Sequence, residues 1–135
     1  MRVAGGCHCG AIVFAAEVDP QRVSICHCTD CQTLSGAPYR ASVAATPDKF
    51  RLLSGEPTIY VKTAESGSRR AQTFCPRCGS PLYATAYGDP TAILNIRLGG
   101  VRQRDQLVPT RQLWGRSHQH WVDDLSAIPR FETTP

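Results

Sequence analysis

Cysteine is the residue type in this sequence whose number and spacing could do chemistry. The 135-residue chain contains seven cysteines in three groups: Cys7 and Cys9, then Cys26, Cys28 and Cys31, then Cys75 and Cys78. Cysteines one or two residues apart are poor disulfide partners in a reducing compartment, but they are good paired ligands for zinc. We therefore predict zinc sites, with reduced thiols or a redox dithiol as the alternative.

The first and third cysteine groups share a local pattern. Gly10 follows Cys9 and Gly79 follows Cys78, and each glycine leads into a strand-like run. A glycine at this place lets the backbone turn tightly, so that N–H groups can point at the thiolates. We predict one closed structural zinc site with four ligands, Cys7, Cys9, Cys75 and Cys78. Structural zinc contributes about 10–16 kcal/mol in small peptides, so this ion could decide whether the domain folds.

The middle group offers only three thiolates, those of Cys26, Cys28 and Cys31. Three protein ligands and a free fourth position are typical of a catalytic zinc, and a thiolate-rich zinc readily accepts a further thiol. The alternative is a second closed site with a histidine as the fourth ligand, either His27, His118 or His120. His27 lies between two cysteines and would point away from the metal in an extended turn.

Prolines and glycines divide the chain into short segments that favour strands over long helices. Turn signals recur about every 8–12 residues, which is typical of an all-β assembly. We expect short helical turns over Thr29–Leu34 and over Pro47–Phe50, the latter with Thr46 as its cap. The expected strands cover Ala11–Val18, Arg22–Cys26, Tyr39–Ala45, Phe50–Leu53, Thr58–Thr63, Arg69–Phe74, Pro81–Tyr87, Ala92–Arg97 and Arg111–Trp114.

Composition and charge exclude several classes of protein. A formal charge of +4 comes from basic residues scattered along the chain, with Arg69-Arg70 as the one adjacent pair, so no nucleic-acid partner is expected. No apolar run approaches the roughly 20 residues that span a membrane, and the N-terminus lacks the apolar region of a signal peptide. No glycine-rich phosphate-binding motif is present. We expect one cytoplasmic domain over residues 1–135, with no membrane or nucleotide partner.

Three cysteine motifs, in this order and spacing, resemble the glutathione-dependent formaldehyde-activating enzyme (GFA) family. They are Gly6-Cys7-His8-Cys9-Gly10-Ala11, then Cys26-His27-Cys28-Thr29-Asp30-Cys31 with Gly36, then the run from Phe74 to Tyr83, within a likeness that covers about Val3–Phe131. The resemblance implies a mainly β, Mss4-like or β-tent fold of stacked antiparallel sheets held together by a structural zinc. It also implies two zinc ions per chain, a structural one at Cys7, Cys9, Cys75 and Cys78 and a catalytic one at Cys26, Cys28 and Cys31.

The activity implied by the resemblance is the attachment of formaldehyde to glutathione, which gives S-(hydroxymethyl)glutathione. Such an enzyme is a carbon–sulfur lyase whose partners are glutathione and a small aldehyde. Glutathione sulfur would bind at the open zinc position and attack the aldehyde carbon as thiolate. The alternative is a non-catalytic zinc-fold module that binds glutathione, another thiol or a protein partner.

One position departs from the family pattern. Family members often carry a basic residue directly after the third cysteine of the middle motif, where this chain has Gln32-Thr33. If that charge holds substrate carboxylates, Arg40, Arg69 and Arg70 are candidates to replace it. The alternative for each is a solvated surface arginine.

Aromatic and acidic residues supply further candidates. Asp30 could accept a hydrogen bond or a proton near the metal, or it could cap the following turn. A tripeptide groove or the core of the domain could be lined by Phe74, Tyr83, Tyr87, Trp114 and Trp121.

Overall fold

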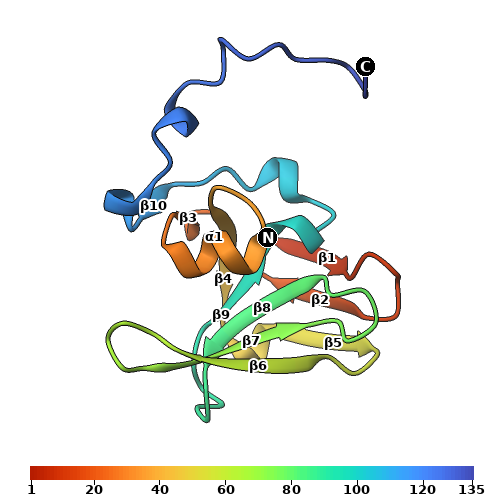
Figure 1. Ribbon diagram of the computed structural model, residues 1–135. Coiled ribbons are helices and arrows are strands. Elements are labelled where there is room, and N and C mark those ends of the chain that lie inside the picture. Colours follow the sequence, from red (N-terminus) through yellow and green to blue (C-terminus); the bar gives the residue numbers. More distant parts are fainter.

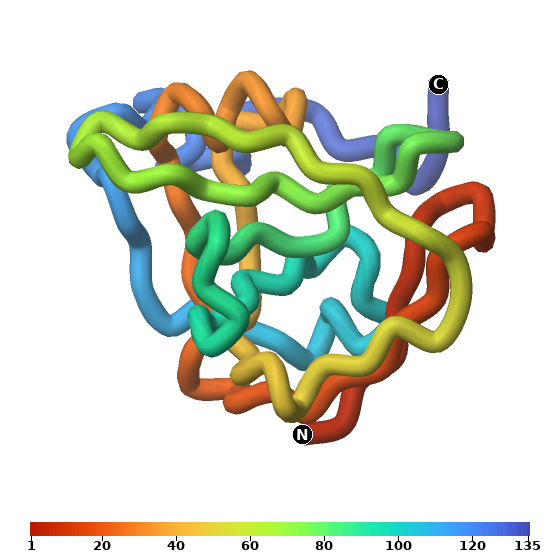
Figure 2. Tube along the Cα trace, turned by 90° about the horizontal axis from the view of Figure 1, so that it is seen from below, coloured from red at the N-terminus to blue at the C-terminus, as the bar shows by residue number.

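Two β-sheets form the body of the protein. The computed structural model describes residues 1–135 (Figure 1). The smaller sheet contains β1 (Arg2–Gly6), β2 (Val13–Glu17) and β5 (Phe50–Ser54), all antiparallel, in the order β1-β2-β5. These three strands lie together at one side of the molecule in Figure 2.

The larger sheet contains seven strands in the order β10-β3-β4-β9-β8-β7-β6. Every pair is antiparallel except the edge pair β10–β3, which is parallel, so this sheet is mixed. The prediction of a mainly β fold with stacked sheets is confirmed. The strands are β3 (Val23–Cys26), β4 (Arg40–Ala45), β6 (Thr58–Thr63), β7 (Arg69–Phe74), β8 (Pro81–Ala86), β9 (Leu94–Arg97) and β10 (Arg111–Leu113).

The helices are short. The single α-helix, α1 (Thr29–Ser35), ends at Gly36 in the left-handed conformation. Pro47 begins a 3-10 helix as predicted, but the side chain of Thr46 makes no capping hydrogen bond there. The 3-10 helices are η1 (Pro47–Lys49), η2 (Leu98–Gly100), η3 (Arg104–Gln106), η4 (Gly115–Ser117) and η5 (His120–Asp123). No helix has both the length and the apolar character that crossing a bilayer requires.

Each of the nine predicted strands corresponds to an observed one, and β6 and β7 match their predicted bounds. Strand β1 was missed. Its sequence, Arg2-Val3-Ala4-Gly5-Gly6, ends in two glycines, which have low β-propensity. The strand forms because it pairs with β2 along its whole length, from Arg2 opposite Glu17 to Gly6 opposite Val13.

The larger sheet has two chemically different faces, because successive side chains of a strand point to opposite sides. On β4 and β9, Val43, Ala45 and Ile96 enter the core, which also receives Phe14 from the smaller sheet. Apart from Ala44, the residues that alternate with them on these strands are polar and point away from the core. This open face carries Arg40 and Ser42 on β4 and Asn95 and Arg97 on β9.

Gly5 lies where the smaller sheet meets the segment that follows β9. A methyl group on Gly5 would lie 2.4 Å from Phe14 Cζ and 2.5 Å from the carbonyl oxygen of Gly100. Gly5 also forms an isolated β-bridge with Val101. The backbone at Gly5 therefore lies closer to its neighbours than any side chain at this position would permit.

We predict that Gly5→Ala lowers the free energy of unfolding by about 1–3 kcal/mol or more, since the backbone oxygen of Gly100 cannot move away cheaply. Gly99→Ala is the matched control, because a methyl group there meets no atom within 4 Å. Urea unfolding of both variants measures the difference. An unchanged stability of Gly5→Ala would contradict the close approach.

Candidate metal centres and the adjacent cavity

The four cysteines of the first and third groups come together in one cluster. The sulfur atoms of Cys7, Cys9, Cys75 and Cys78 all lie within 4.8 Å of one another. Cys7 Sγ is 3.5 Å from Cys9 Sγ, which is 3.8 Å from Cys75 Sγ. Tetrahedral zinc with Zn–S bonds of 2.3 Å requires sulfur separations of about 3.8 Å. The donor set and its spacing therefore fit a zinc ion.

Two similar turns hold these four cysteines. Gly10 and Gly79 both have positive φ, of 80° and 77°, as the tight-turn interpretation requires. In the first turn the N–H of Ile12 donates a hydrogen bond to Cys7 Sγ at 3.2 Å. A further bond joins the two turns, because the N–H of His8 donates to Ser80 Oγ at 3.0 Å. The cluster thus connects the β1–β2 turn with the β7–β8 turn.

The middle group forms a second cluster at the end of β3. Cys26 ends that strand, Cys28 caps α1, and Cys31 lies in the first turn of the helix. Their sulfur atoms lie within 4.8 Å of one another, and Cys28 Sγ accepts a hydrogen bond from the N–H of Cys31 at 3.3 Å. A hydrogen bond from the Cys31 thiol lowers the pKa of Cys26 to about 5. This soft, thiolate-forming donor set fits a zinc ion with three protein ligands.

None of the three candidate histidines joins this cluster. His27 is buried and points away, with Nε2 at 2.7 Å from Gln112 Oε1 and its ring against Tyr39 and His118. Nε2 of His118 lies 3.1 Å from Asp123 Oδ2. The hydrogen bond with Asp123 and, to a smaller extent, the one with the Gly115 carbonyl raise the pKa of His118. The closed-site alternative therefore has no fourth protein ligand in this structure.

A cavity of about 240 Å³, here called the thiol cavity, lies over the thiols of Cys26, Cys28 and Cys31 on the open face of the larger sheet. The strand register explains its lining: Cys26 is opposite Arg40, Ser42 is opposite Arg97, and Ala84 is opposite both Asn95 and Gln72. No aspartate or glutamate lines the cavity. Its four cationic residues, Arg40, Lys62, Arg70 and Arg97, come from four different strands.

The structure separates the three arginines that the sequence offered as carboxylate ligands. Arg40 and Arg70 line the thiol cavity. Arg69, which neighbours Arg70 on β7, points to the other side and lies over the ring of Tyr87, 4.6 Å from its centroid. Sequence reasoning missed Arg97, although its two-residue spacing from Asn95 on β9 could have placed it on the polar face.

Gln32 takes a structural role that sequence reasoning also missed. Its Nε2 donates hydrogen bonds to the carbonyl oxygens of His27 at 2.8 Å and Ser117 at 3.0 Å. Its Oε1 accepts a hydrogen bond from Gln119 Nε2 at 2.8 Å. Gln32 therefore fastens the segment after β10 onto the cysteine-bearing helix α1.

The aromatic and acidic candidates lie in different parts of the structure. Trp114 lines the thiol cavity and is the one non-glycine residue with positive φ, 55°. Tyr83 instead packs against the core. Asp30 does not cap the helix, because Cys28 does; its Oδ2 accepts a hydrogen bond from Lys62 Nζ at 2.8 Å.

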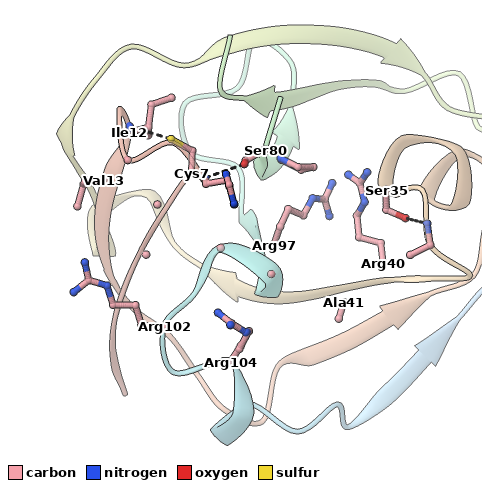
Figure 3. Close-up of a pocket in the computed structure, with 18 of the residues that line it drawn as sticks. Cys7, Ile12, Val13, Ser35, Arg40, Ala41, Ser80, Arg97, Arg102 and Arg104 are labelled. Atoms are coloured by element: carbon pink, nitrogen blue, oxygen red, sulfur yellow. Dashed lines mark hydrogen bonds between the residues drawn. The ribbon is translucent and has the colours of Figure 1, made fainter. Parts of the chain in front are cut away.

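A second and larger cavity, of about 690 Å³, lies between the Cys7 turn and the end of α1. Figure 3 shows Arg40 and Arg97 side by side in its wall, with Arg102 and Arg104 on another side. Arg40 and Arg97 therefore form part of the walls of both cavities.

Known proteins resemble this chain in sequence and in fold. A Halomonas elongata protein provisionally named as a glutathione-dependent formaldehyde-activating enzyme is 30% identical over 87 residues, which are 62% of this chain and 55% of that protein. An uncharacterized lyase of Schizosaccharomyces pombe is 31% identical over 80 residues, 58% of this chain and 54% of that protein. The chain thus spans about half the length of the curated relatives it matches.

The fold has a relative of known crystal structure, a Rhodobacter sphaeroides protein with a TM-score of 0.59. That likeness covers 81% of this chain and 98% of the other at 19% identity, so it concerns the fold alone. The family model for the glutathione-dependent formaldehyde-activating enzyme matches residues 2–117, a range that contains both cysteine clusters and the thiol cavity. The chain belongs to the glutathione-dependent formaldehyde-activating enzyme family.

Proposed function

We propose that this protein is a zinc-dependent carbon–sulfur lyase that joins glutathione to formaldehyde or a related small aldehyde. The observation that carries the proposal is the cluster of Cys26, Cys28 and Cys31, which has three soft donors, no fourth protein ligand and a cationic cavity above it. Family membership and the lyase name of one relative support the same class of reaction. We also propose that one domain, with its core at about residues 3–131, contains the whole site.

In the proposed reaction the sulfur of glutathione attacks the carbonyl carbon of the aldehyde. One S–C bond forms, the carbonyl π bond breaks, and the proton lost by the thiol ends on the new hydroxyl oxygen. The product is S-(hydroxymethyl)glutathione, and no oxidant or reductant is needed. Zinc held by three thiolates would supply a vacant position that lowers the pKa of a further thiol.

The two clusters have different proposed roles because their surroundings differ. Cys7, Cys9, Cys75 and Cys78 would hold a structural ion, since four sulfurs already complete a tetrahedron and join two distant turns. Cys26, Cys28 and Cys31 would hold the ion of the active site. Leu113 and Trp114 line the wall of that cavity.

Lys62 is placed to assist the reaction as a hydrogen-bond donor. Its side chain is 17% exposed, lines the thiol cavity and is oriented by Asp30 at 2.8 Å. An ammonium group in this wall can donate to the aldehyde oxygen as negative charge develops there.

The test of the proposed function is glutathione-dependent consumption of formaldehyde by the zinc-loaded protein, measured against the uncatalysed rate. We expect saturation with glutathione and two zinc ions per chain. One tightly held ion and no response to glutathione would instead indicate a non-catalytic zinc module.

The division into two kinds of site predicts opposite effects of two equivalent substitutions. Cys28→Ser should keep the fold and one zinc ion per chain but lose activity. Cys78→Ser should lose the structural ion and unfold at a much lower temperature, because metal binding contributes directly to the folding free energy. Metal analysis and thermal unfolding distinguish the two, and equal unfolding of both variants would refute the division.

We predict that Lys62→Met lowers kcat about tenfold to a hundredfold with a smaller effect on KM, since the lost hydrogen bond forms mainly in the transition state. Lys49→Met is the matched control: Lys49 is half exposed and pairs with Glu17 at 3.8 Å, away from the cavity. An unchanged kcat for Lys62→Met would exclude the donor role.

A further inference from the structure

Two arginines on neighbouring strands line the thiol cavity and are largely shielded from solvent. Arg40 on β4 is 6% exposed, and Arg97 on the adjacent strand β9 is largely covered. Arg97 donates to Ser42 Oγ at 2.8 Å and to Gln72 Oε1 at 2.9 Å. Arg40 donates to the same Gln72 oxygen at 3.3 Å. One neutral amide oxygen is thus shared by two guanidinium groups.

No acidic side chain compensates this pair, since neither arginine takes part in a salt bridge. Each guanidinium has five N–H donors, and only three hydrogen bonds from the pair reach protein acceptors. The Nε atoms of Arg40 and Arg97 are both buried without any partner. Burial and, to a smaller extent, the positive charge of Arg40 lower the pKa of Arg97 to about 9. A buried charge without an acidic partner is costly, so the arrangement favours the binding of an anion beside the two guanidinium groups.

The thiolates of the three-cysteine cluster supply only part of this negative charge. Three thiolates and one Zn²⁺ carry a formal charge of −1, and a bound substrate thiolate would make it −2. Arg40, Arg97 and the half-buried Arg70 together carry +3, whereas Lys62 is already paired with Asp30. One positive charge therefore remains for one further anionic group within the same cavity.

We propose that Arg40 and Arg97, together with Arg70, bind a carboxylate of the thiol substrate, so that the site selects carboxylate-bearing thiols over neutral ones. The planar guanidinium fork matches a carboxylate and bonds it more strongly than neutral donors do. The inference rests on the proposed function, because it assigns the rest of the molecule whose sulfur reacts at Cys26, Cys28 and Cys31. Gln72 and Ser42 are positioning residues that hold the two side chains towards the cavity.

The test compares glutathione with glutathione diethyl ester, which has the same sulfur but no free carboxylate. Isothermal titration calorimetry on the zinc-loaded protein, without aldehyde, measures both dissociation constants. We expect the wild-type protein to bind glutathione about tenfold to a hundredfold more tightly than the ester, the range of hydrogen bonds to a charged group. Arg97→Gln and Arg70→Gln should remove most of this preference.

Two control variants test whether the preference for glutathione over its ester arises in the thiol cavity. Arg69→Gln removes the same charge from the same strand on the opposite face and should leave the preference unchanged. Arg102→Gln removes a charge from the larger cavity and should also leave it unchanged. Because Arg70 is only half buried, Arg70→Gln gives an answer even if Arg97→Gln does not fold.

The outcomes separate this inference from the proposed function. Equal binding of glutathione and ester by the wild-type protein would overturn carboxylate recognition and leave thiol binding intact. If Arg70→Gln and Arg97→Gln weaken the binding of glutathione and of its ester equally, the arginines only balance the charge of the thiolates and carboxylate recognition is overturned. A loss of preference in Arg102→Gln would move the carboxylate to the larger cavity and overturn the assignment. If neither ligand binds the wild-type protein, the proposed function itself fails.

Discussion

The alternation of side chains across the seven-stranded sheet is the constraint on which the site depends. Val43 and Ile96 must face the core, so the register of β4 and β9 sends Arg40 and Arg97 to the opposite face. A slip of one residue would exchange the two sets, placing guanidinium groups in the core and aliphatic groups over the thiols. The hydrophobic burial that stabilises the sheet thus also selects the lining of the cavity.

The two cysteine clusters occupy different kinds of place in this framework. The four-cysteine cluster connects two turns that are far apart in sequence, at the boundary between the smaller and larger sheets. The three-cysteine cluster lies at the end of one strand, beside the open polar face. A metal at the first would join separate parts of the fold, whereas a metal at the second would face a cavity. This difference is the physical basis for assigning stability to one and chemistry to the other.

Charge in this protein is concentrated by the fold rather than by the composition. The chain has a formal charge of only +4, and its basic residues are scattered in sequence. Four strands nevertheless bring Arg40, Lys62, Arg70 and Arg97 to one cavity without any acidic lining. Such a site can attract anions although the protein as a whole carries little net charge. The segment after β10, fastened to α1 through Gln32, brings Trp114 to the edge of the same cavity.

The sequence by itself determined the features that depend on local pattern. Period-two hydrophobicity and turn residues located nine of the ten strands. Short spacings divided the cysteines into three groups, and the glycines after Cys9 and Cys78 joined the first and third groups into one of two candidate sites. The missed strand, β1, contains two glycines and forms only because β2 pairs with it. Tertiary structure alone decided that Arg70 lines the cavity and Arg69 does not, that Arg97 joins Arg40 at Gln72, and that no histidine completes the three-thiol cluster. The physical reason is that local pattern reports on neighbours in the chain, whereas the partners of a side chain across a sheet depend on strand order and register.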